Sequence, residues 1–129
     1  MVVTLGRNLL LDTLMATTFY VGLIDSASFT GYSSADTMSS HAGWIEAVGY
    51  SEGVRQTYSV VAASGGSVTN SGSKAVFTVL TTATIRGVFL TTGSAKSGTA
   101  GTLYGVADLI VVRNVIIGNI LHLTITLTD

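Results

Sequence analysis

A serine, an aspartate and a histidine follow one another in the order that α/β hydrolases use for catalysis. Ser51 is the centre of Gly-Tyr-Ser-Glu-Gly (49–53), a Gly-x-Ser-x-Gly pattern, and Asp108 and His122 come later in the chain. A nucleophile elbow requires a helix directly after its serine, because the turn must expose the hydroxyl above a parallel sheet. The β-branched segment that follows Ser51 favours a strand instead. We therefore predict a protein that is not an enzyme and has no catalytic residues, with a small serine hydrolase using Ser51 as a remote alternative.

The remaining carboxylates and histidines suggest two further kinds of site. Glu46 and Glu52 could act as the acid pair of a glycoside hydrolase, but a sugar cleft is usually lined by several aromatic rings and the chain has one Trp. His41 stands five residues from both Asp36 and Glu46, in a segment without the i, i+4 spacing that makes helical ligands converge. The chain has no Cys, so it has no thiolate ligands and no disulfides. We expect neither a metal nor a cofactor.

The charge of the chain is low and scattered. The sequence contains six Lys and Arg and seven Asp and Glu. Charged residues make up 10% of it, against a typical value of about 25%. Nucleic-acid binding needs clustered cations, which are absent, so we expect no nucleic-acid partner. A neutral surface of Ser, Thr, Gly and Asn can lie against a protein partner without burying unpaired charges. The same composition would also suit strands whose outer faces are rich in Thr.

The N-terminal segment is apolar but too short for a signal peptide or a membrane span. Residues 9–11 and Leu14 follow Arg7, and Asp12 interrupts the apolar run. No stretch approaches the roughly 20 apolar residues that a membrane-spanning helix needs. We expect no membrane partner.

The element that begins the chain is expected to be a helix over residues 5–16. At 100° per residue, Leu10, Leu11, Leu14 and Met15 fall on one face. A helix this short must dock on its own domain or on a neighbouring subunit to be stable. The chain thus divides into an N-terminal arm with a short helix (1–16) and a single β-sandwich domain (17–129).

The rest of the chain alternates with a period of two, as strands do. Leu121, Leu123, Ile125 and Leu127 alternate with polar residues most regularly, and Trp44 is expected to anchor the core. The predicted fold class is mainly β, an antiparallel β-sandwich or jelly roll with a short N-terminal helix. Its strands are expected at residues 19–25, 44–50, 57–62, 74–80, 82–92, 101–109 and 121–128.

Glycine- and serine-rich segments separate these strands. Turns are expected at 64–67 and 70–73, a flexible loop at 92–101, and an irregular segment at 26–43 in which Asp36 caps a turn of helix. With no Pro and few charges, the sheet edges would have to be covered by a neighbouring subunit or distorted by bulges.

The order of these apolar patterns resembles a group of small structural proteins of tailed bacteriophages, which comprises capsid decoration (cement) proteins and tail-fibre-like proteins. The resemblance covers most of the chain and departs from the group at 118–125, where Asn119 stands in a turn that usually has Gly-Asp. It implies a homo-oligomeric sandwich that clamps major capsid subunits on the virion surface after synthesis in the host cytoplasm. The segments that carry it are NLLLDTLM (8–15), YVGLID (20–25), SVTNSGSKAVFTV (67–79), ATIRGVFLTT (83–92), GTLYGVADL (101–109) and LHLTITLT (121–128).

The predicted function is therefore a viral structural protein that binds and stabilises the major capsid shell, with a tail or tail-fibre component as the alternative. Binding the assembled shell but not its free subunits stabilises the shell by mass action. The expected partners are the major capsid protein and further copies of the chain, as a dimer or trimer. Contacts are expected from residues 2–15, 26–43 and 92–100, and the partner-contact residues predicted by name are Leu10, Leu14, Tyr32, Met38 and Tyr50.

Overall fold

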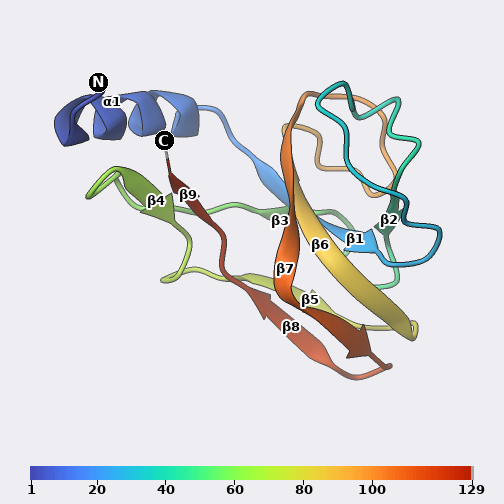
Figure 1. Cartoon of the computed structure of the whole chain (residues 1–129). Coiled ribbons are helices and arrows are strands. Elements are labelled where there is room, and N and C mark those ends of the chain that lie inside the picture. Colours follow the sequence, from blue (N-terminus) through green and yellow to red (C-terminus); the bar gives the residue numbers. More distant parts are fainter. Residues whose placement is uncertain (129) are drawn as a thin grey trace.

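The computed structural model describes residues 1–128, and these form one helix and nine strands whose pairings are all antiparallel (Figure 1). This confirms the predicted mainly β class with a short N-terminal helix. The elements are α1 (Thr4–Met15), β1 (Tyr20–Asp25), β2 (Ile45–Ala47), β3 (Gln56–Thr57), β4 (Ser67–Thr69), β5 (Ala75–Thr78), β6 (Ala83–Thr91), β7 (Leu103–Val115), β8 (Ile120–Leu123) and β9 (Thr126–Thr128).

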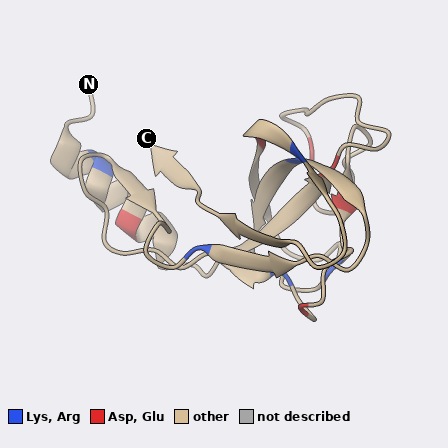
Figure 2. Cartoon of the chain, turned by 90° about the horizontal axis from the view of Figure 1, so that it is seen from below, with Lys and Arg blue, Asp and Glu red and all other residues tan. Residues whose placement is uncertain are grey.

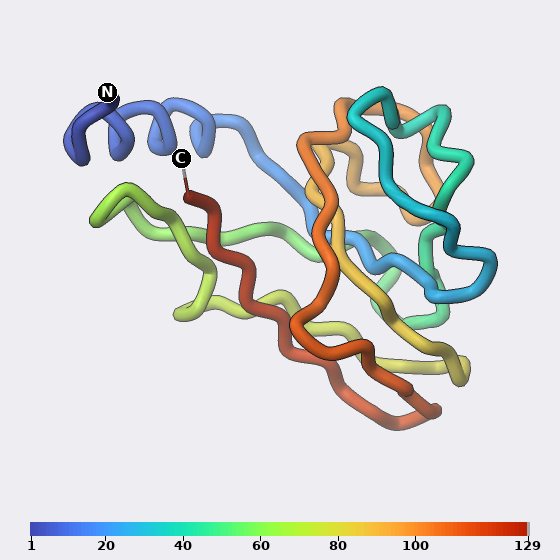
Figure 3. The backbone as a smooth tube through the Cα atoms, in the orientation of Figure 1, coloured from blue at the N-terminus to red at the C-terminus, as the bar shows by residue number. Residues whose placement is uncertain are grey.

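The main sheet has the strand order β2-β1-β6-β7, and β3 also pairs with β1. Two ribbons, β5–β8 and β4–β9, complete the β structure. The turn after β5 and the turn after β7 both lead from one layer to the other and lie side by side (Figure 3). The Val79 amide donates to the Asn119 carbonyl at 2.8 Å, which ties the two turns together. This two-layer arrangement is compatible with the predicted sandwich.

Strand β1 is buried on both faces because each face meets a different hydrophobic cluster. Val21 and Leu23 belong to the main core between the layers, whereas Ile24 faces a second cluster under the 26–43 loop. Gly22 is required where it stands, since a Cβ there would lie 2.1 Å from the ring of Phe89. The main core consists of Phe19, Val21, Leu23, Ala47, Tyr50, Tyr58, Ala75, Phe77, Val79, Ile85, Val88, Leu90 and Val115.

The last predicted strand is present, but it is split into β8 and β9. Its apolar residues pack against the main core and its polar residues are exposed, as the alternation predicts. The split is made by the buried side chain of Asn70, which donates to the Leu123 carbonyl at 3.1 Å and accepts from the Ile125 amide at 2.7 Å. The Leu123 carbonyl and the Ile125 amide are therefore bonded to a side chain and not to a neighbouring strand. This is the point where the chain passes from β8, which pairs with β5, to β9, which pairs with β4.

Three local predictions were wrong. The strand predicted at 57–62 stops at Thr57, because Tyr58 turns inward and donates its hydroxyl to the Ile125 carbonyl at 2.7 Å. Burial raises the pKa of Tyr58 to about 12, which keeps this donor protonated. Ser67, the last residue of the turn expected at 64–67, instead begins β4, which pairs with β9. Asp36 caps no helix; it accepts from the Ser33 amide and the Trp44 indole.

Candidate interaction surface

Helix α1 is fixed to the domain by one face. Asn8 Oδ1 accepts from the Gly66 amide at 2.8 Å, and Asp12 Oδ1 accepts from the Ala63 amide at 2.7 Å. Leu11 lies beside Asn8 on the inner side of the helix and is 4% exposed. Asn8 and Asp12 are four residues apart, so the two bonds hold one stripe of the helix against the segment that leads into β4. Figure 1 shows α1 lying beside β4, away from the main sheet.

The side of α1 that faces away from Leu11 is largely apolar and uncovered. Leu5 is 80% exposed, Leu9 is 68% exposed and Leu10 is 55% exposed. Of the two charged residues of the helix, Arg7 packs against Gly66 and Asp12 is bonded to the Ala63 amide. Because α1 is held in a fixed orientation, Leu5, Leu9 and Leu10 form an exposed apolar surface together with Val2, which precedes the helix. We call these four residues the α1 outer face.

The predicted contact residues fall into two groups. Leu10 is exposed on α1 and available to a partner, whereas Leu14 is half-buried against the main core. Met38 and Tyr50 are 3% and 2% exposed, so their prediction as contacts was wrong. Both have a place inside the fold, since Met38 packs with Trp44 in the second cluster and Tyr50 packs in the main core. Tyr32 is half-buried.

The 26–43 loop is a packed cap on the main sheet. Trp44, 1% exposed as expected for a core anchor, donates its indole N–H to Asp36 at 3.1 Å and stacks on the His41 ring at 3.8 Å. The Tyr32 hydroxyl donates to Asp108 Oδ1 at 2.7 Å. Burial, reinforced by this carboxylate, raises the pKa of Tyr32 above its usual range. His41 therefore has an internal role, and the loop is held to β7.

The 92–101 loop, predicted to be flexible, is also pinned. Arg55 is fully buried and binds both carboxylate oxygens of Glu46, at 2.9 and 2.6 Å. Its guanidinium also donates to the carbonyls of Gly93 and Gly98. The Ser97 amide donates to Glu46 at 3.0 Å, so one buried ion pair holds the loop at three points. The loop is held in this way because glycine and serine supply backbone groups that a buried arginine and its carboxylate can bind.

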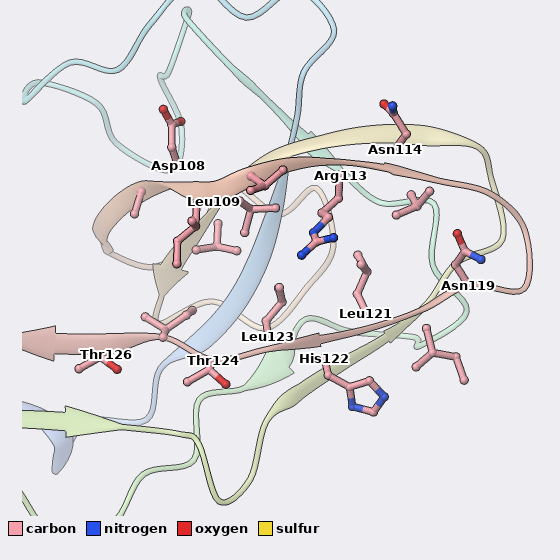
Figure 4. Close-up of a pocket in the computed structure, with 17 residues that line it drawn as sticks. Asp108, Leu109, Arg113, Asn114, Asn119, Leu121, His122, Leu123, Thr124 and Thr126 are labelled. Carbon is pink, nitrogen blue, oxygen red and sulfur yellow. The ribbon is translucent and has the colours of Figure 1, made fainter.

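The residues of the remote hydrolase alternative are not brought together. Ser51 lies in an exposed turn, and its amide donates to the Thr78 carbonyl. Asp108 and His122 project in opposite directions from the two strands that carry them (Figure 4). Asp108 is bonded to Tyr32, and no hydrogen bond within residues 1–128 links it to His122 or Ser51. This geometry does not form the relay that activates a serine.

The carboxylates also have separate structural partners. Glu46 binds Arg55, whereas Glu52 accepts from the Thr78 amide at 2.8 Å and from its hydroxyl at 2.9 Å. Burial alone would raise the pKa of Glu52, but the bonds from Thr78 outweigh it and hold the pKa below its usual value. Within residues 1–128 no three His, Asp or Glu side chains converge on a possible metal position.

A cleft of about 850 Å³ separates β7 from β8 and β9. Leu109 and Arg113 of β7 point into it from one side, and Leu121 and Leu123 of β8 point into it from the other (Figure 4). Among the described strands, β7 pairs with β6 alone and β8 with β5 alone. Each strand that borders the cleft therefore has one edge with no strand partner.

A bulge shapes the β7 wall of this cleft. Ile85 of β6 is paired with Arg113 and Gly87 with Asp108, so residues 109–112 of β7 stand opposite the single residue Arg86. Bulges of this kind bend a strand and push side chains out of it. Ile110 is fully exposed in consequence. The apolar residues 110–112, directly after the predicted end of the strand at Leu109, are the sequence feature that indicates its continuation.

Comparison with known proteins found no family model, no curated protein and no solved structure that matches this chain. Across residues 1–128 no helix has both the length and the apolar run needed to cross a membrane.

Proposed function

We propose that this chain is a viral structural protein, a decoration or cement protein that binds the assembled major capsid shell of a tailed bacteriophage. The observation that supports the proposal is the α1 outer face, which is apolar, held in place and uncovered. The proposal that the particle is a tailed bacteriophage rests on the sequence resemblance to small phage structural proteins.

The α1 outer face has the properties that a docking surface needs. Burying an exposed leucine is worth about 1.5–3 kcal/mol, so Leu5, Leu9 and Leu10 together supply a useful affinity. The helix is already ordered by Asn8 and Asp12, which reduces the entropy lost on binding. A shell repeats its docking positions many times, and each bound copy favours the assembled state by mass action.

The experiment is a binding assay on shells assembled from the major capsid protein of the same phage genome. Replacing Leu5 and Leu9 with Gln should leave the fold intact and weaken co-sedimentation with shells at least tenfold, because 1.4 kcal/mol of lost burial is a factor of ten. The control replaces Thr4, which is exposed on the side of the same helix that carries Leu11, with Gln and should bind as the wild type does.

Wild-type protein that does not sediment with shells would contradict the proposal. Binding to purified tails in place of shells would assign the chain to the tail instead. Equal shell binding by the Leu5→Gln/Leu9→Gln variant and its control would remove α1 as the docking surface.

A further inference from the structure

The cleft between β7 and β8 is a place where the main core opens at the side of the molecule. Leu109, Leu121, Leu123 and Ile125 are only partly buried against the core, and all four line the cleft. Protein interiors are normally packed to the density of organic crystals. A cavity of about 850 Å³ bordered by core side chains is therefore large enough to receive a further segment of chain.

The edge of β8 that does not face β5 is the better acceptor for such a segment. Strand β7 carries a bulge and a charged side chain that points inward, Arg113, and both are devices that oppose the addition of a strand. Strand β8 has no Lys, Arg, Asp or Glu, and His122 lies on its outer side. Extended peptides commonly bind by adding a strand to a free edge of this kind.

The charge in the cleft indicates what the segment carries. Arg113 points into the cleft (Figure 4), and it forms no ion pair with the carboxylates of residues 1–128. Asp108, which stands at the other end of the bulge, is turned away and engages Tyr32 and Arg86. The cleft therefore combines apolar and polar residues with one arginine that has no ion pair among residues 1–128, which is complementary to a partly apolar segment with a carboxylate.

We propose that the cleft takes an extended segment of the shell protein that adds as a strand to β8, directs alternate apolar side chains between Leu109 and Leu123, and places one carboxylate on Arg113. The identity of the partner rests on the proposed function. The site itself is separate from the α1 outer face, and the two surfaces together give each copy two points of attachment to the shell.

The experiment compares amide hydrogen exchange in the free protein and in the shell-bound protein, together with two charge variants. On binding, the amides of residues 120–124 that do not pair with β5 should exchange at least tenfold more slowly. Arg113→Gln should weaken shell binding at least fivefold, and Arg113→Lys should retain most of it. The matched control is Lys74→Gln, which removes an exposed positive charge outside the cleft and should bind as the wild type does.

The possible failures are distinct. Shell binding with unchanged exchange in residues 120–124, and with Arg113→Gln equal to Lys74→Gln, would overturn the cleft site and leave the proposed function intact. Absence of shell binding would overturn the proposed function. Concentration-dependent protection of residues 120–124 without shells would mean that a second copy of the chain fills the cleft, and would overturn the assignment of the shell protein as occupant.

Discussion

The loop end of the molecule (residues 26–43 and 92–101) and helix α1 both lie at the surface, but they are held in opposite ways. The loop end turns its charged and aromatic side chains inward, where Arg55 meets Glu46 and Trp44 meets Asp36. Helix α1 uses its polar side chains as anchors and turns leucines outward. Figure 2 shows the low number of charged residues across the molecule, with one basic and one acidic position on α1.

The comparison shows that a surface with few charges can arise for two different reasons. In the loop end, Gly and Ser are backbone partners of buried groups, so their presence reflects internal packing. In α1 the uncharged surface has no internal partner, so its apolar character is available for binding. A prediction of contacts from composition and loop length alone cannot distinguish these cases.

The largest effect is expected from Arg55→Ala, which would test whether the loop end depends on its buried ion pair. The change leaves the Glu46 carboxylate without its partner at a site where its side chain is 8% exposed. Removing one member of a buried pair typically costs about 3–5 kcal/mol, because the remaining charge is uncompensated. We expect a loss of that size in the free energy of unfolding measured with urea.

The control is Arg113→Ala, which removes an exposed arginine that is in no ion pair with residues 1–128. Its effect on stability should lie within about 0.5 kcal/mol. Equal losses for the two variants would mean that Arg55 does not fasten the loops, and the contrast between the two regions would disappear.

A smaller effect should separate the two faces of α1. Leu11→Ala empties a buried position and should cost about 2–5 kcal/mol, at the low end of this range because the helix lies at the edge of the domain. Leu9→Ala alters an exposed position and should change stability by no more than about 0.5 kcal/mol. Thermal unfolding of the two variants measures both, and a large loss in Leu9→Ala would show that the outer face is covered within the free protein.

The fold was predictable from sequence where a local pattern decides burial. Val21 and Leu23 share a core face because side chains alternate along a strand, and the four apolar residues of 121–127 lie on the inner side for the same reason. The split at Asn70 and the fastening by Arg55 were not predictable, because they join residues far apart in the chain. Arg55 reaches Gly98 across 43 positions, and no local periodicity records such a contact.

The prediction of contact residues from sequence could not include the orientation of α1 or the course of β7. The period of the helix groups Leu10 with Leu11, yet the rotation of α1 is set by bonds from Asn8 and Asp12, which bring Leu11 inward and leave Leu10 outside. The end of β7 was missed because its bulge interrupts the alternation from which strands are recognised. Both errors concern tertiary hydrogen bonding and register, which no single segment determines.

The smallest predicted effect concerns Glu52, which ties the turn after Tyr50 to β5. The pKa of Glu52 is below the ordinary value of 4.5 in the folded chain, so its stabilising contribution is present at neutral pH and is lost as the pH falls through the folded pKa. Glu52→Gln should therefore lower stability slightly at pH 7 and converge with the wild type as the pH falls below the folded pKa. Urea unfolding at pH 7, 5 and 3 measures the difference. A gap between the two proteins that stays constant down to pH 3 would mean that the Thr78 bonds do not depend on the carboxylate charge.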